Sequence, residues 1–330
     1  MESRPKRDRC TRAVGDQPLK LLVTGALGYV GRFLVDALGD AGHAVVAHAR
    51  RTPPTDFYRR APHGTVVADL SLLGAIDAAL DEVDAVVHCA ASMYGEEEAI
   101  HRRNNVAATE QLLRSVRKAG CPRLVHLSSF AVYGKRRQTG TTEDAPLDRS
   151  GDPYTRTKIL AEDAVRAADD LETVILRPGL VWGGPDDERI NQRLERLLRS
   201  RIFVFPGRCD TPLPMTHIAN LAEAVSRSLT VQGERGEAFN ITDAEPVSLR
   251  EFVEALARDR GLPPPRIALP LALIRPAVRA LDLAARIAGV SLQKDESRFR
   301  LLNEPCYFDI EKAREHLGYH PRAREFLGDK

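Results

Sequence analysis

Eight residues, TGALGYVG from Thr24 to Gly31, contain the clearest structural signal in the chain. They join an apolar run to a segment whose apolar residues recur at helical spacing, a pattern that predicts a strand, a turn and a helix. Gly25, Gly28 and Gly31 follow one another at three-residue intervals, and Gly31 falls inside the helix, where glycine costs ~1 kcal/mol relative to alanine. A glycine-rich turn before a helix lets the backbone approach a pyrophosphate. We therefore expect a dinucleotide at this turn.

The pattern of strand, turn and helix continues along the chain. Five further apolar runs alternate with helical segments: HAVVAHARR, GTVVADL, VDAVVHCAAS, RLVHLSSFAVYG and ETVILRPGLVWG. Near-continuous apolar strands between helices predict an α/β fold with a doubly wound parallel sheet, covered by helices on both faces. We expect a dinucleotide-binding domain over residues 19–180. Residues 181–330 are predicted to form a smaller, mostly helical, substrate-binding portion that returns some elements to the sheet.

Composition narrows the class of protein. With 330 residues, 43% of them hydrophobic, the chain is long enough to bury a sizeable core. Residues 1–18 are predicted to be a disordered basic tail, and no apolar run reaches the ~18 residues of a membrane span. Five scattered cysteines favour a reducing, cytoplasmic location, and nine histidines without ligand spacing predict no metal site. Basic residues do not alternate with aromatic ones, so no nucleic-acid partner is expected.

The end of the second strand indicates which dinucleotide binds. An NAD site usually carries a carboxylate there, whereas this strand ends AHARRTPP, with Arg50 and Arg51. A guanidinium matches the geometry of a 2′-phosphate, so we expect NADP(H) in preference to NAD(H); the alternative is that both arginines face water. The cofactor is also predicted to contact the residues that end the third strand, Asp69 and Leu70, and those that follow the fourth strand, Ala90 and Ala91.

A tyrosine and a lysine four residues apart, in GDPYTRTKILAEDAV, supply the predicted chemistry. Asp152 and Pro153 are suited to the N-cap and first turn of a helix, so Tyr154 and Lys158 lie on one stripe of it. An ammonium one turn away favours the phenolate form, which suits tyrosine to exchange a proton with a carbonyl oxygen. Ser129, after the fifth strand, is placed to hydrogen-bond that oxygen.

Taken together, these segments resemble the extended short-chain dehydrogenase/reductase family, including its NAD-dependent epimerase/dehydratase group. The resemblance rests on TGALGYVG, ADL, HCAAS, HLSSFAVYG, YTRTK, LRPGLVWG and YFDIEKAREHLGYHP, and covers residues 19–327. It implies that Tyr154 and Lys158 are the catalytic pair and that Ser129, in preference to Ser128, is the active-site serine. The cofactor-binding residues are expected to be those already named, together with Tyr29, Val30, Tyr154, Lys158 and Pro178.

Departures from the family pattern concern the substrate. Nucleotide-sugar members carry polar groups where this chain has Leu180 and Leu213–Pro214, and a diphosphate buried against those residues would be unsatisfied. HIANLAEAV and the aliphatic segment from Ile267 to Val290 instead resemble the hydroxysteroid dehydrogenase and dihydroflavonol reductase branches. The resemblance implies an oxidoreductase that interconverts a ketone and a secondary alcohol on a largely apolar small molecule, such as a sterol, terpenoid or polyketide-like compound.

Two other functions remain open at this point. One is a nucleotide-sugar epimerase, dehydratase or ketoreductase, which requires an arginine able to reach a diphosphate. The other is a non-catalytic NADP-binding regulator, which the presence of Ser129, Tyr154 and Lys158 disfavours. The expected partner is a small-molecule substrate, and the sequence is compatible with a homodimer.

Overall fold

The computed structural model describes residues 17–322, except 56, 58–60, 62, 82, 94–96, 122, 135–136, 186, 188–190, 202, 275 and 277–300. The predicted basic tail lies almost entirely outside the described residues. So does most of the aliphatic segment that starts at Ile267.

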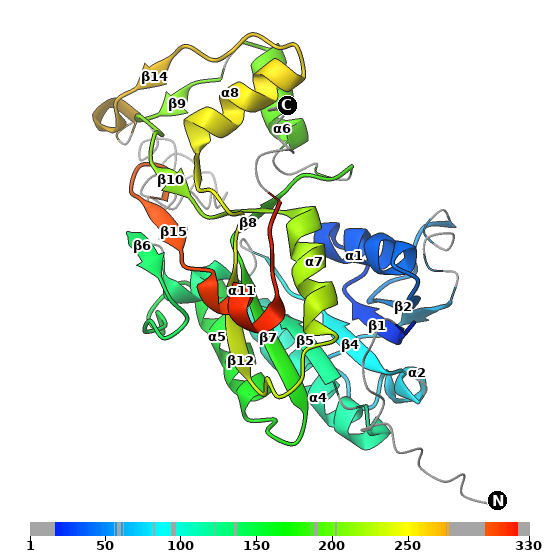
Figure 1. Ribbon diagram of the computed structural model, residues 1–330. Helices are drawn as coiled ribbons and strands as arrows, with labels where there is room; N and C mark the ends of the chain where they lie inside the picture. The colour runs from blue at the N-terminus through cyan, green and yellow to red at the C-terminus, as the bar shows by residue number, and fades with distance from the viewer. Residues whose placement is uncertain are drawn as a thin grey trace, which may run out of the picture.

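A seven-stranded parallel sheet lies at the centre of the molecule (Figure 1), which confirms the predicted fold class. Its strand order is β12-β7-β5-β4-β1-β2-β3, and every neighbouring pair is parallel. The strands are β1 (Lys20–Thr24), β2 (Ala44–Ala49), β3 (Thr65–Val67), β4 (Ala85–His88), β5 (Arg123–Leu127), β7 (Glu172–Pro178) and β12 (Glu237–Ile241). The chain winds outward from β1 in one direction and then from β4 in the other. A crevice opens at this reversal, outside the carboxyl ends of β1 and β4.

Helices cover both faces of the sheet because alternate strand residues point to opposite sides. Val23 belongs to the apolar cluster under α1 (Tyr29–Asp40), α7 (Ile218–Ser228) and α11 (Glu311–Leu317). Its neighbour Leu22 belongs to the cluster under α2 (Asp77–Leu80), α4 (Ala108–Ala119) and α5 (Pro153–Arg166). The inner strands β1, β4, β5 and β7 are therefore buried on both sides, as the near-continuous apolar runs predicted, whereas the edge strand β3 is partly exposed.

Two of the predicted strands end earlier than their apolar runs. β5 stops at Leu127, and the rest of its run forms a short 3-10 helix, η4 (Phe130–Tyr133). β7 stops at Pro178, where the chain leaves the sheet because Leu180 donates its N–H to Pro214. The following β8 (Leu180–Trp182) pairs instead with β11 (Met215–His217). Apolar character alone does not show where a strand exchanges partners.

A second lobe lies beyond the end of the sheet at which β7 continues into β8 (Figure 1). Trp182, Phe205, Leu213 and Phe252 pack in its apolar core. Its elements are α6 (Asn191–Arg199), α8 (Leu249–Asp259), β9 (Phe205–Pro206) with β14 (Ala268–Leu269), and β10 (Pro212–Leu213) with β13 (Val247–Ser248). Four shorter elements complete the described fold: α3 (Glu98–His101), the π-helical turn η3 (Arg102–Ala107), β6 (Gln138–Thr141) and β15 (Cys306–Phe308).

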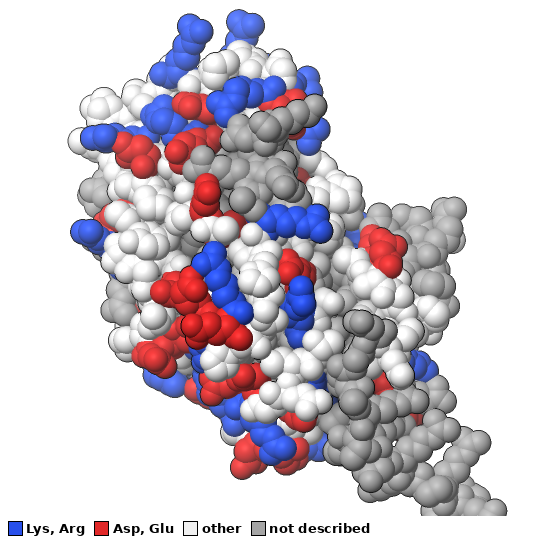
Figure 2. All heavy atoms as spheres, viewed as in Figure 1, with Lys and Arg blue, Asp and Glu red and all other residues white. Residues whose placement is uncertain are grey.

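Acidic and basic side chains are interspersed over the face of the molecule drawn in Figure 2. Among the described residues, several charged side chains far apart in the sequence form pairs, for example Lys312 with Glu237 and Arg149 with Asp163. None of the helices in the described part of the chain is both long and apolar enough to cross a bilayer.

Candidate active site

The glycine turn packs closely against the end of β4. Gly25 has a φ of +68°, and a Cβ there would lie 2.7 Å from the Ala90 Cα. A Cβ on Gly31 would lie 2.3 Å from the carbonyl oxygen of Gly25, so the first turn of α1 fits only without a side chain. Gly28 is the N-cap residue of α1. Sterics therefore explain why glycine occurs at position 31 inside the helix: without a side chain there, the N-terminus of α1 can pack against the glycine turn.

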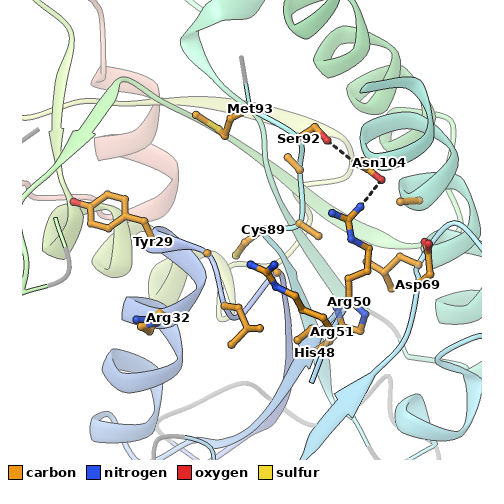
Figure 3. Close-up of a pocket in the computed structure, with 18 residues that line it drawn as sticks. Tyr29, Arg32, His48, Arg50, Arg51, Asp69, Cys89, Ser92, Met93 and Asn104 are labelled. Atoms are coloured by element: carbon orange, nitrogen blue, oxygen red, sulfur yellow. Dashed lines mark hydrogen bonds between the residues drawn. The ribbon is translucent and has the colours of Figure 1, made fainter. Parts of the chain in front are cut away.

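A cavity of about 650 Å³ opens at this turn, in the crevice between β1 and β4 (Figure 3). Nine of the predicted cofactor-binding residues line it: Gly25, Gly28, Tyr29, Arg50, Arg51, Asp69, Leu70, Ala90 and Ala91. The other lining residues are Leu27, Arg32, His48, Ala49, Cys89, Ser92, Met93, Asn104 and Ala108. Predicted residues outside the lining are Val30, Gly31, Ser129, Tyr154, Lys158 and Pro178.

The charge of the cavity wall is mainly positive. Arg32, Arg50 and Arg51 line it, and Asp69 is the acidic side chain among its lining residues. Asp69 pairs with Arg103 and accepts hydrogen bonds from Ser71. Burial opposes ionisation, but the Ser71 hydrogen bonds and the nearby guanidinium groups hold the pKa of Asp69 below its ordinary value. An anion with several phosphates would find a cationic wall here.

Helix α5 begins where the sequence predicted. The Asp152 side chain accepts a hydrogen bond from the Thr155 N–H at 3.1 Å, and Pro153 occupies the first turn. Tyr154 and Lys158 are 5% and 2% exposed, so the stripe that carries them faces the interior. The predicted catalytic pair is therefore buried beside the end of β5.

Lys158 is held by the sheet beneath it. Its Nζ donates to the carbonyl oxygen of Leu127, the last residue of β5, at 2.6 Å. Burial lowers the pKa of Lys158 from 10.5 to about 8. The ring of His101 lies edge-on to Tyr154, with 6.1 Å between the centroids. Burial also raises the pKa of the neighbouring Cys89 thiol to about 12, so that thiol stays protonated at neutral pH.

The two serines after β5 have different surroundings. Ser129 is the N-cap residue of η4, and its Oγ accepts from the Ala131 N–H at 3.2 Å. α5 packs against η4, which brings Ser129 to the same region as Tyr154. The Oγ of Ser128 is buried and has no hydrogen-bond partner among the described residues. Glu162 pairs with Arg177 at 2.8 Å, and Arg177 holds the pKa of Glu162 down against the effect of burial. Ser129 therefore remains the serine that the family pattern predicts, and its hydroxyl proton is not used by the bond from Ala131.

Asn105, which the sequence reasoning missed, links the cavity wall to α5. Its Oδ1 accepts from the Ser92 N–H at 2.7 Å, and its Nδ2 donates to the Thr157 Oγ1 at 3.1 Å. Thr157 lies between Tyr154 and Lys158 in the sequence of α5. The signal available was a pair of asparagines, poor helix formers, inside an otherwise helical pattern.

A directed chain of hydrogen bonds fixes the end of β4. The Thr109 hydroxyl donates its one proton to the Asn105 carbonyl, so His88 Nε2, at 2.9 Å, donates to Thr109. His88 Nδ1 therefore carries no proton and accepts from the Thr24 hydroxyl at 2.8 Å. The Thr24 oxygen in turn accepts from the Ala90 N–H. Burial lowers the pKa of His88 to about 3, so the ring stays neutral and the chain stays intact.

The residues predicted to define the substrate lie in the second lobe. Leu213 is 2% exposed and belongs to the core of that lobe, so it is a packing residue and not a wall of the 650 Å³ cavity. Leu180 is partly buried against the same core. Ile267, Leu269 and Leu273 are 54%, 41% and 65% exposed; the segment from 277 to 290 lies outside the described residues.

Metal ligation has no support in the described residues, where no group of three or more His, Cys, Asp or Glu side chains could hold an ion.

The two lobes are connected at the cavity: the Tyr29 hydroxyl donates to the carbonyl oxygen of Gly183, just after β8, at 2.5 Å.

Comparison with known proteins agrees with this geometry. The model of the NAD-dependent epimerase/dehydratase family matches residues 21–242. A 3 beta-hydroxysteroid dehydrogenase/Delta 5-->4-isomerase of Mycobacterium tuberculosis is 30% identical, over 94% of this chain and 90% of its own. A 2-alkyl-3-oxoalkanoate reductase of Stenotrophomonas maltophilia is 31% identical, over 92% and 96%. A farnesyl-dihydroquinoline-oxide ketoreductase of Stigmatella aurantiaca is 29% identical, over 94% of each chain.

Solved structures show the same architecture. The crystal structure of gox2253 superposes with a TM-score of 0.76 over 94% of this chain and 96% of that one; at 24% identity this likeness concerns the fold alone. MoeE5, solved with UDP-glucuronic acid and NAD, superposes with a TM-score of 0.70 at 26% identity, over 94% and 97%.

Proposed function

We propose that this chain, which belongs to the NAD-dependent epimerase/dehydratase family of extended short-chain dehydrogenases/reductases and is an oxidoreductase, uses NADP(H) as its cofactor. Its proposed reaction interconverts a ketone and a secondary alcohol on a largely apolar small molecule. The observation that carries the proposal is the packing of Leu213 in an apolar core, at a position where nucleotide-sugar enzymes present polar groups. A diphosphate brought against that core would lose its hydration without gaining donors.

The described residues fit a nicotinamide dinucleotide. The glycine turn and the N-terminus of α1 present backbone to the 650 Å³ cavity, where a pyrophosphate would lie. When bound, the cofactor supplies or accepts a hydride. Arg50 and Arg51 line the cavity beyond β2, where the 2′-phosphate of NADP would lie, and Arg32 adds a third cation. This cationic wall favours the more highly charged of the two cofactors.

Three side chains of this protein would manage the proton. Tyr154 would donate a proton to the substrate oxygen during reduction and remove it during oxidation. Lys158, fixed by the Leu127 carbonyl, places a positive charge one helical turn away, which favours the tyrosinate that forms. Ser129 would donate a hydrogen bond to the substrate oxygen and orient its carbon toward the nicotinamide.

Names among the relatives support this reaction class. One relative is named for a steroid alcohol, and two are named for reduction of an oxo or keto group. The rival function is that of a nucleotide-sugar enzyme, because MoeE5 was solved with UDP-sugars. A nucleotide-sugar enzyme requires a cation within reach of the diphosphate. At the position where such enzymes present a polar or charged group, this chain has Leu213.

A thermal-shift panel tests the proposal. A ligand that binds only the folded protein raises the melting temperature with its concentration. We expect NADPH to raise it most, NADH less, and UDP-glucose not at all, even with NADPH present. Stabilisation by UDP-glucose comparable to that by NADPH would replace this proposal with the rival.

A further inference from the structure

Two adjacent asparagines hold the same residue of the cavity wall. Asn105 accepts a hydrogen bond from the Ser92 N–H at 2.7 Å, and the Asn104 Nδ2 donates to the Ser92 Oγ at 2.6 Å (Figure 3). Both belong to η3, the π-helical turn from Arg102 to Ala107. In a regular α-helix, adjacent side chains are ~100° apart around the axis, and the wider π turn reduces that angle. The turn thus directs two carboxamides at one serine.

Beyond Ser92, the two asparagines reach in different directions. Asn105 continues to Thr157, on the helix that carries Tyr154 and Lys158. Asn104 continues to Arg50, whose Nη1 donates to its Oδ1 at 3.0 Å (Figure 3). One carboxamide is therefore connected to the predicted catalytic helix and the other to the predicted phosphate-binding arginine.

The contact between Asn104 and Arg50 restrains the guanidinium without neutralising it. An arginine has five N–H donors, and this bond uses Nη1 and a neutral acceptor. A nearby carboxylate, Asp69, is already paired with Arg103 and hydrogen-bonded by Ser71. Arg50, which lines the cavity, thus keeps its full charge while its side-chain freedom is reduced. Restraint of this kind lowers the entropy cost of binding a ligand.

We propose that Asn104 is a positioning residue for cofactor selectivity: it holds Arg50 in place for the 2′-phosphate of NADP(H). This inference rests on the proposed use of NADP(H). It concerns Asn104 alone, because Asn104 contacts Arg50 whereas its neighbour Asn105 contacts Thr157 of α5.

The carboxamide itself matters, because it accepts from Arg50 and donates to Ser92 at once. Asn104→Ala removes both contacts. Asn104→Asp keeps an acceptor for Arg50 but adds a negative charge, which partly neutralises the guanidinium and repels a phosphate. Asp should therefore harm NADPH binding more than Ala does, although Asp is closer in shape to Asn.

The test measures dissociation constants of NADPH and NADH for the wild type, Asn104→Ala, Asn104→Asp, Arg50→Ala and the Asn104→Ala/Arg50→Ala pair. Loss of a restraint predicts about a 3- to 10-fold weaker NADPH complex in Asn104→Ala, and loss of a charged contact predicts about 10- to 100-fold in Asn104→Asp. NADH binding should change by less than about twofold, since it carries no 2′-phosphate. Arg102→Ala, on the same turn but paired with Glu98, is the control and should change neither constant.

The double variant separates the possible outcomes. If Asn104 acts through Arg50, Asn104→Ala will not alter the NADPH-to-NADH ratio once Arg50 is alanine. A selective loss in Arg50→Ala with no selective loss in either Asn104 variant would overturn this inference alone. An unchanged ratio in Arg50→Ala would overturn the proposed cofactor, and this inference with it. Equal losses for both cofactors in Asn104→Ala would mean that the residue only supports the cavity wall.

Discussion

The cofactor cavity and the second lobe use polar residues differently. Around the cavity, polar side chains at the strand ends are joined in chains of hydrogen bonds, such as the one from Ala90 through His88 to Asn105. In the second lobe, Leu213 and Phe252 pack in an apolar core. The cavity is thus built before a ligand arrives, whereas the lobe offers mainly aliphatic packing. We propose that cofactor chemistry depends on the first region and substrate choice on the second.

The largest expected effect is at Tyr154, on the buried stripe of α5. Tyr154→Phe removes the proton donor but leaves the ring in place, so turnover should fall by about 10²–10⁴-fold, the usual contribution of a general acid. Cofactor affinity should be nearly unchanged, because Tyr154 does not line the 650 Å³ cavity. Steady-state kinetics together with a cofactor titration measure both quantities. Full activity in this variant would remove Tyr154 from the mechanism.

The charges of Arg50 and Arg51 in the cavity wall should affect the affinity for NADPH and not that for NADH. Replacing Arg50 and Arg51 by alanine should weaken NADPH binding by ~1.5–3 kcal/mol for each charged hydrogen bond lost. NADH, without the 2′-phosphate, should be nearly unaffected. Isothermal titration with both cofactors checks this. If both lose affinity equally, the arginines do not select the cofactor.

The buried lysine gives the cavity region a pH dependence. Its pKa is about 8 when folded and 10.5 as a free side chain, so between these values the unfolded chain binds more protons. Stability contributed by Lys158 therefore rises with pH across this window, by about 2 kcal/mol from pH 7.5 to 9.5. Urea denaturation of the cofactor-free wild type and Lys158→Met should show this rise in the difference between them. A difference independent of pH would mean that Lys158 is not desolvated.

The glycine turn offers a matched pair of substitutions in one helix. Gly31→Ala forces a Cβ to 2.3 Å from the carbonyl oxygen of Gly25. This overpacking should lower the free energy of unfolding by ~1–3 kcal/mol and weaken the binding of both cofactors. Gly39→Ala, at the other end of α1, places its Cβ in open space and should stabilise by about 0.4–1 kcal/mol. Chemical denaturation of both variants measures the contrast. Similar effects from the two would show that α1 tolerates movement at the turn.

Features set by local sequence could be predicted, whereas contacts between distant segments could not. Local periodicity and capping chemistry predicted the sheet, the glycine turn, the cap at Asp152 and the placement of Tyr154 and Lys158 on one stripe of α5. Asn104, Asn105 and His88 were missed because their contacts join residues 12 to 64 positions apart, through Ser92, Thr157 and Thr24. A strand end can be predicted from local pattern. The partner of a side chain across the sheet depends on topology.

The roles of residues in the second lobe were harder to predict from the sequence for a related reason. Leu213 was expected to shape a ligand site, yet its side chain fills a core. An apolar residue in a loop-rich region has two possible uses, packing or binding, and spacing does not distinguish them. Its predictive value is therefore indirect: it excludes a charged group from that position.

NADPH oxidation with a series of cyclic ketones of increasing size, with UDP-glucose as a competitor, tests the proposed function most directly. Each buried methylene should contribute ~0.8 kcal/mol, so KM should fall about fourfold per added methylene until the pocket is full. UDP-glucose should not inhibit. Tight competition by UDP-glucose, with a KM indifferent to ketone size, would contradict the account.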